Sequence, residues 1–198
     1  MTTETDGRRA KGARRRRALV DATLRVVARD GVAAVSHRNI ARVAGVPTAS
    51  IGYYFASIDD LFVATLLDSV EVLVADMDRM TREVTAPEQW PMAVARSLAE
   101  MLGDKRERTI AEYELYLLAA RRPALRPAAR RWIEVATGYV NGGEGGDPDA
   151  IRAAFATIDG LLMQGLIADA PPTAEELEPA LKYVLQPVDY LRDAGVIR

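Results

Sequence analysis

Residues 36–55 read SHRNIARVAGVPTASIGYYF. Ser36 is a favoured helix N-cap, and apolar residues follow it at helical spacing as far as Gly45, a residue type that commonly ends helices. Pro47 opens a second short helical segment, because proline is tolerated in a first helical turn. The stretch therefore predicts two short helices joined by a tight turn around Gly45, Val46 and Pro47.

Helical periodicity continues on both sides of this stretch. Upstream, a helix is predicted from Arg14 to the residue before Gly31. Downstream, Ser57 and Asp60 form a capping-box-like pair that opens a long helix to Val84. Further helices are predicted at about 88–102, 107–121, 127–139 and 149–168. Thr173 and Glu176 are predicted to cap a last helix that runs towards Ala194 and is kinked or split near Pro179 and Pro187.

Residues 141–148, NGGEGGDP, form the clearest predicted loop. No stretch alternates polar and apolar residues with a period of two, and no internal repeat is present. The prediction is an all-α fold of about nine helices, in which a three-helix unit precedes a larger helical bundle.

Two short helices packed on a longer preceding helix are typical of a helix-turn-helix, which inserts its second short helix into the DNA major groove. The inner faces are predicted to consist of Ile40, Val43, Val46, Ile51 and Phe55. The outer face would then present Thr48, Ala49, Ser50, Tyr53 and Tyr54. Hydroxyl groups bind phosphates or base edges, and an alanine methyl group contacts thymine, so this face suits DNA reading.

Charge is distributed unevenly along the chain. The net charge of −2 over 198 residues gives no sign of nucleic-acid binding. Residues 1–56, however, hold 11 Lys or Arg and 4 Asp or Glu, whereas residues 57–198 hold 15 and 24. Net charges of +7 and −9 indicate that only the N-terminal part meets a polyanion. For residues 1–12, a disordered basic tail is an equally good interpretation.

The composition excludes several kinds of chemistry. The chain has no cysteine and a single histidine, His37, so disulfides, cysteine nucleophiles and cysteine-containing zinc sites are absent and a catalytic triad would need His37. We therefore expect no metal, no cofactor and no catalysis. The apolar run Leu161–Ala168 is too short for a membrane span, and no signal peptide is evident, so we expect a cytoplasmic protein without membrane contact.

Residues 14–67 resemble the DNA-binding domain of TetR-family transcriptional regulators. Four parts occur in order: a first helix ending at Gly31, Ile-Ala-x-x-Ala-Gly-Val from Ile40, Tyr-Tyr-Phe from Tyr53, and Ser-x-x-x-Leu from Ser57. The resemblance implies a homodimer whose chains each carry a DNA-binding domain and a larger helical domain for effector binding and dimerisation. We accordingly expect a flexible basic arm at 1–13, a helix-turn-helix domain at 14–56 and an effector and dimerisation domain at 57–198.

The resemblance also implies DNA contacts for individual residues. His37 and Arg38 match positions that contact DNA from the second helix, and Thr48, Ala49, Ser50, Tyr53 and Tyr54 match the recognition face. Two residues depart from the family pattern: Gly52 replaces a frequent tyrosine, and Ile58 replaces a lysine that usually contacts phosphate. We hypothesise that a basic arm compensates, formed by Arg14, Arg15, Arg16 and Arg17 and extended by Arg8 and Arg9.

Residues 108–127, followed by Trp132, resemble the effector domain of a subset of these regulators. The candidate effector pocket comprises Met101, Tyr113, Tyr116, Trp132, Phe155, Asp159 and Met163, with core packing as the competing interpretation for each. Asp159 needs a partner in its apolar helix, which could be a ligand, an interhelical network or a second subunit. Under the family pattern, helix 149–168 and the last helix form the dimer interface, where Gly160 and Gly165 would allow close approach.

The sequence thus predicts a ligand-responsive repressor that binds a palindromic DNA operator as a homodimer and is released by an unidentified small molecule. Two alternatives from other classes are an all-helical enzyme with a pocket in the acidic part, and an adaptor that binds proteins through its basic end.

Overall fold

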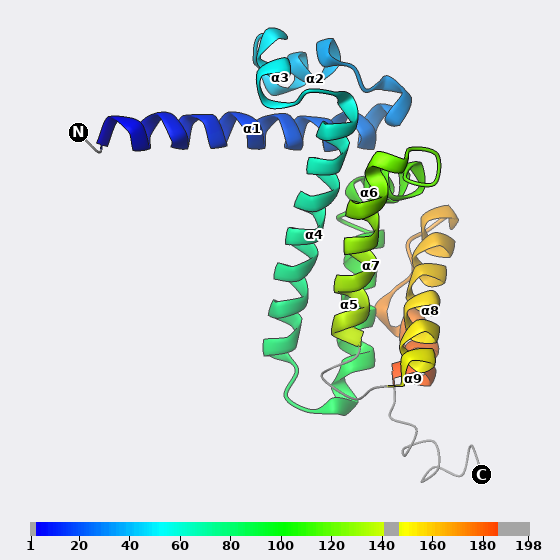
Figure 1. Ribbon diagram of the computed structural model, residues 1–198. Helices are drawn as coiled ribbons and strands as arrows, with labels where there is room; N and C mark the ends of the chain where they lie inside the picture. The colour runs from blue at the N-terminus through cyan, green and yellow to red at the C-terminus, as the bar shows by residue number, and fades with distance from the viewer. Residues whose placement is uncertain (1–2, 141–146, 186–198) are drawn as a thin grey trace, which may run out of the picture. The chain divides into compact units, whose positions relative to one another are not determined.

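The computed structural model describes residues 3–140 and 147–185, and each regular element within them is helical. Nine α-helices are labelled in Figure 1: α1 (Thr3–Asp30), α2 (His37–Ala44), α3 (Ala49–Tyr54), α4 (Ile58–Glu83), α5 (Trp90–Leu102), α6 (Arg106–Leu118), α7 (Arg126–Val140), α8 (Pro148–Ile167) and α9 (Ala174–Leu185). Short 3-10 turns occupy Val32–Ala34, Pro87–Gln89 and Pro123–Leu125. The predicted all-α fold is confirmed.

The helix-turn-helix segment, residues 36–55, has the predicted boundaries. The Asn39 N–H donates to Ser36 Oγ at 3.2 Å, so Ser36 caps α2. Gly45 ends α2 at a φ of 67°, a left-handed conformation that strains residues with a side chain. α3 begins at Ala49, with Thr48 at its N-cap position. The two helices lie side by side in Figure 1.

Two further helix starts carry the predicted caps. The Asp60 N–H donates to Ser57 Oγ at 3.0 Å before α4. At α9 the bonds are reciprocal: the Thr173 N–H donates to Glu176 Oε2 at 2.8 Å, and the Glu176 N–H donates to Thr173 Oγ1 at 3.3 Å. The second pair is therefore a complete capping box.

Some boundaries differ from those predicted. α1 begins at Thr3, so residues 3–13 are helical where a flexible arm was expected. α9 continues through Pro179 to Leu185. Most of the predicted loop, residues 141–146, lies outside the described residues, as do Pro187 and the expected end of the last helix.

The described chain folds as two compact units that are discontinuous in sequence. The first runs to Glu71 and takes in Glu107 to Trp132, whereas the second takes Val72 to Arg106 and continues from Ile133. The divisions therefore fall inside α4 and inside α7. The predicted domain boundary after Ala56 is a division by function, and it stays a prediction.

The first unit contains two apolar clusters, and α1 and α4 contribute to both. Leu19 of α1 and Leu61 of α4 pack with residues of the helix-turn-helix segment. Further along the same helices, Val27 and Phe62 pack with residues of α6 and α7. The same two helices, α1 and α4, therefore pack against both the helix-turn-helix segment and the α6–α7 segment.

In the second unit, α9 packs on α5 and α8. Gly165 of α8 is buried against Leu102 of α5, and a Cβ atom at Gly165 would lie 2.5 Å from a Leu102 methyl carbon. The Arg106 guanidinium donates to the carbonyl oxygen of Leu166 at 2.6 Å near the end of α8. Gly165 therefore permits a close approach within its own chain.

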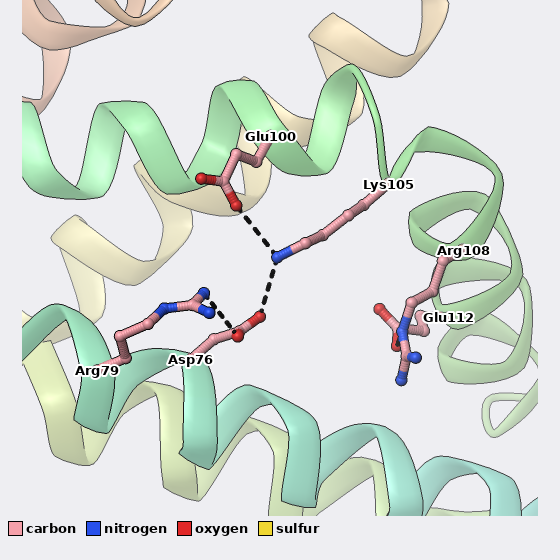
Figure 2. A network of polar contacts seen from close by, with 6 residues as sticks. All are labelled: Asp76, Arg79, Glu100, Lys105, Arg108 and Glu112. Atoms are coloured by element: carbon pink, nitrogen blue, oxygen red, sulfur yellow. Dashed lines mark hydrogen bonds and ion pairs between the residues drawn. The ribbon is translucent and has the colours of Figure 1, made fainter.

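A polar network joins α4 to the C-terminal end of α5 (Figure 2). The Lys105 ammonium contacts Asp76 at 3.2 Å and Glu100 at 3.1 Å, and Arg79 contacts the other oxygen of Asp76 at 2.9 Å. Burial is the largest single influence on the pKa of Lys105 and lowers it. The hydrogen bonds and charges of the Glu100 and Asp76 carboxylates together outweigh burial, so the pKa of Lys105 lies above the ordinary lysine value. The network links α4 to the end of α5.

Among the described helices, α8 alone has the length and apolar composition that a membrane span requires. Only 17% of the 18-residue window that meets this criterion is buried. Buried core helices and signal sequences satisfy the same criterion, so it is weak evidence for a membrane.

We expect Gly165→Ala to destabilise the protein by about 1–3 kcal/mol, because the new methyl group would overlap the buried Leu102 side chain. Urea unfolding at a fixed protein concentration measures this change.

Gly138→Ala on α7 is the matched control. A Cβ there meets no atom within 4 Å, so the variant should gain up to about 1 kcal/mol from helix propensity. Equal stability of the two variants would show that the α5–α8 contact is not tight.

Candidate nucleic-acid interface

The helix-turn-helix segment buries one face of each short helix. Ile40 and Ile51 are fully buried, Phe55 is 4% exposed, and Val43 and Val46 pack against the same cluster. The five residues predicted for the inner faces therefore all belong to this core or lie against it.

The opposite face of α3 is available to solvent. Thr48 and Ala49 are exposed, Ser50 is half-buried, and Tyr53 is 83% exposed. The exposed Tyr53 ring on α3 is therefore available for contact with a partner. The structure thus places small hydroxylated residues and one tyrosine on the face predicted to read DNA.

The two adjacent tyrosines differ in their surroundings. Tyr54 is half-buried and packs against the helix-turn-helix core, and its hydroxyl lies 4.0 Å from the position of a Cβ on Gly12 of α1. The Tyr53 and Tyr54 rings meet edge to face with centroids 4.9 Å apart. Tyr54 therefore packs towards α1 and supports Tyr53, which is the outward tyrosine of the pair.

The polar residues of α2 also differ in accessibility. Arg38 and Arg42 are both exposed, but Arg42 donates a hydrogen bond to Asn39 Oδ1 at 2.7 Å. His37 is half-buried, and its Nε2 atom is buried without a hydrogen-bond partner. Arg38 is consequently the α2 side chain best placed to reach a DNA phosphate or guanine.

The four consecutive arginines of α1 are exposed, but two of them have partners within the first unit. Arg17 pairs with Asp68 of α4 at 2.8 Å and with Asp21 at 3.5 Å. The Arg16 guanidinium lies 5.1 Å from the centre of the Phe55 ring, within the range of a cation–π contact. Arg16 and Arg17 thus hold α1 on the helix-turn-helix segment and α4.

Asp68 is the acidic partner in this arrangement. Burial raises the pKa of its carboxyl group above the ordinary aspartate value, and the Arg17 and Arg108 guanidinium groups oppose this rise. The ionised form of Asp68 therefore depends on its cationic neighbours.

The predicted effector-pocket residues are divided between the two compact units. In the first unit, Tyr113 and Tyr116 of α6 meet edge to face at 6.4 Å, and Trp132 is half-buried. The second unit contains the remaining four: half-buried Met101, Phe155 and Asp159, and Met163 at 43% exposure. Their common role in a pocket stays a prediction.

Three features of the structure were not singled out from the sequence. Glu112 on α6 is buried and accepts a bond from Arg108 Nε at 2.8 Å. Glu114 accepts a hydrogen bond from the Val32 N–H, and Arg122 pairs with Asp59, so both contact the flanks of the helix-turn-helix segment. A groove of about 580 Å³ between α4 and α5 contains none of the predicted pocket residues and is lined by the charged residues Asp76, Arg79, Glu83, Glu88, Arg96 and Glu100, among others.

Two family models match the chain. One, described as bacterial regulatory proteins of the tetR family, matches residues 19–65. The other, described as a tetracyclin repressor-like C-terminal domain, matches residues 86–187. Together they cover the helix-turn-helix segment and most of the helices that follow.

Individual proteins are similar as well. BetI, an HTH-type transcriptional regulator of Rhizobium meliloti (strain 1021), is 38% identical over 82 residues, which span 41% of this chain and 40% of BetI. SCO1917, a TetR-family structure from Streptomyces coelicolor A3, is 40% identical with a TM-score of 0.74, over 87% of this chain and 98% of that one. The multidrug binding protein EbrR, solved with ethidium, is 39% identical with a TM-score of 0.73, over 87% and 99%.

We expect Arg17→Gln to raise the pKa of the Asp68 carboxyl group further, because burial would then act with less opposition. Below pH 3.8, the ordinary aspartate pKa, Asp68 is protonated in both the folded and the unfolded protein, so its raised pKa does not affect the free energy of unfolding. As pH rises from 3.8 through the folded pKa, the unfolded protein loses this proton more readily, and the free energy of unfolding decreases. The stability lost in Arg17→Gln should therefore be larger at pH 7 than near pH 4, as urea unfolding would show.

Asp68→Asn supplies the control background, since it removes the titrating group. In that background, the effect of Arg17→Gln should hardly vary between the two pH values. A loss that has the same pH dependence with and without Asp68 would contradict the coupling.

Proposed function

Because the chain belongs to the TetR family of transcriptional regulators, we propose that it is a repressor that binds a palindromic operator as a homodimer and is released by a small-molecule effector. The observation that carries this proposal is α3, a short helix with one face buried in a core and the other presenting Tyr53, Thr48 and Ala49 to solvent. In a dimer, two such helices would read half-sites about 34 Å apart.

Direct contacts with DNA are assigned to two helices. His37 and Arg38 on α2, with Thr48, Ala49, Ser50, Tyr53 and Tyr54 around α3, form the proposed reading surface. Tyr53 and Arg38 are its most accessible large side chains. His37 and Tyr54 are half-buried, so we assign them supporting positions at its edge.

The basic residues of α1 form a second proposed contact. Gly12 lies near Tyr54 and Arg16 lies near Phe55, so this part of α1 runs beside the end of α3. Arg16 and Arg17 have partners in the protein, which makes the exposed Arg14 and Arg15 the better candidates for phosphate. Such contacts would replace the one that Ile58 cannot make.

We propose α8 and α9 as the dimer interface. Ile167 is 84% exposed on α8, and Tyr183 is 71% exposed on α9. Both helices thus leave a large apolar side chain available for contact with a second chain. Family membership supports the same assignment, and it accounts for the apolar composition of α8 without a membrane.

For the effector we propose aromatic organic cations. Solved structures of the similar protein EbrR hold ethidium, proflavin and malachite green, which are aromatic cations. In this chain, the α6 rings of Tyr113 and Tyr116 support the proposal, because aromatic faces attract cations. Differential affinity for two conformations of the repressor would release the operator.

We assign binding, and not catalysis, to the chain. With one histidine and no cysteine, the sequence offers few groups for nucleophilic or acid–base chemistry. As a DNA-binding regulator the protein would act in the cytoplasm.

Fluorescence anisotropy with a duplex from upstream of the protein's own gene tests the function. We expect specific binding of two chains per operator that persists at roughly 150 mM salt. Replacing Arg14 and Arg15 together by Gln should reduce the slope of log K against log salt by about 2, because each phosphate contact contributes roughly 1.

Arg29→Gln is the control in the same helix, since Arg29 pairs with Asp30 at the C-terminal end of α1. Its salt slope should equal that of the wild type. Binding that shows no preference between the upstream duplex and a scrambled one would overturn the repressor function, whereas an unchanged slope in the double variant would remove only the Arg14 and Arg15 assignment.

Effector binding is tested on the protein without DNA, because these dyes also bind DNA. We expect malachite green to raise the unfolding temperature, with about 2.7 kcal/mol of stabilisation at a dye concentration of 100 times Kd. Tyr113→Ala should weaken dye binding by about tenfold through loss of an aromatic contact.

Leu117→Ala, a change at an exposed position of the same helix, should leave dye affinity unchanged. If the dye binds neither the wild type nor any variant, the proposed effector class is wrong, although operator binding could still be specific.

A further inference from the structure

Two polar contacts join α6 and the turn that follows it to the flanks of the helix-turn-helix segment, all within the first compact unit. The first involves Glu114 in the middle of α6. Its Oε2 atom accepts a hydrogen bond from the backbone N–H of Val32 at 2.9 Å. This bond spans 82 positions in sequence and is partly buried.

The acceptor is needed because of where Val32 lies. Gly31 ends α1 at a φ of 79°, and Val32 begins the 3-10 turn, so the Val32 N–H has no partner inside that turn. At the other end of the turn, Asn39 Nδ2 of α2 donates to the Ala34 carbonyl oxygen at 3.1 Å. Hydrogen bonds therefore connect Glu114 to the start of the 3-10 turn and the end of that turn to α2.

The second contact lies at the other flank. Arg122, just after α6, pairs with Asp59 in the first turn of α4 at 2.5 Å. Its guanidinium also lies 5.4 Å from the centre of the buried Phe62 ring. Asp59 lies four residues after Phe55, the C-cap residue of α3, so Arg122 contacts the chain just after it leaves the recognition helix.

We propose that Glu114 and Arg122 are positioning residues for operator recognition, which fix the helix-turn-helix segment at its entry and its exit without contacting DNA. This inference rests on the proposed function. It makes α6, which lies far beyond the DNA-binding motif in sequence, a part of the DNA-reading body. Because base readout requires helices placed within about half an ångström, loosening either contact should reduce specificity more than general DNA affinity.

The test uses the full-length dimer with operator and scrambled duplexes. Glu114→Ala should weaken operator binding about tenfold while leaving the scrambled duplex and the salt slope unchanged. Glu114→Gln keeps an oxygen that accepts the Val32 N–H, so its operator affinity should stay within about threefold of the wild type. A charge effect alone would move both variants together.

Glu107→Ala, at an exposed position of the same helix, is the charge-matched control and should behave as the wild type. Arg122→Gln and Asp59→Asn should each weaken operator binding by about fivefold, and the double variant should show no further loss if the two side chains act as a pair.

The outcomes separate this inference from the proposed function. A wild-type protein that does not prefer the operator overturns the function itself. If the wild type is specific but Glu114→Ala and Arg122→Gln bind the operator equally well, or lose both duplexes in proportion, the positioning role is overturned. A lower salt slope in Arg122→Gln would overturn it too, because that result would make Arg122 a phosphate contact.

Discussion

The recognition helix α3 has six residues, and a helix of that length does not persist alone in water because nucleation is costly. Its existence depends on Ile51 and Phe55, which are anchored in the core formed with α1, α2 and α4. Gly52 adds to this dependence, since a glycine inside a helix contributes no intrinsic stability. Substitutions on the exposed side of α3 should therefore affect stability less than substitutions on its buried side, where Ile51 and Phe55 anchor the helix.

The same core determines what the arginines of α1 can do. Four adjacent arginines appear equivalent in the sequence, yet Arg16 stacks on Phe55 and Arg17 pairs with Asp68. Two cations thus join α1 to the helix-turn-helix segment and α4, whereas Arg14 and Arg15 are exposed. Part of the positive charge of the N-terminal segment is therefore engaged in contacts within the protein.

The support of the DNA-reading helices extends beyond the N-terminal motif. Val27 and Phe62 pack with residues of α6 and α7, so apolar contacts join the two segments before any polar bond is considered. The polar contacts of Glu114 and Arg122 further restrict how these two segments can be arranged, because hydrogen bonds and ion pairs constrain geometry more narrowly than apolar contacts do. A compact unit assembled from separate parts of the chain is the result.

Local sequence patterns are sufficient to predict the helices, the caps at Ser36, Gly45 and Thr173, the buried face of α3 and the family motif. These features depend on residues within a few positions of one another, where backbone hydrogen bonding and periodicity act. Tertiary structure alone decided that Glu114 meets Val32, that Gly165 accommodates Leu102, and that Tyr53 is the outward one of the two tyrosines. Such contacts join surfaces from distant segments, and local propensity carries no information about which surfaces meet when the core packs.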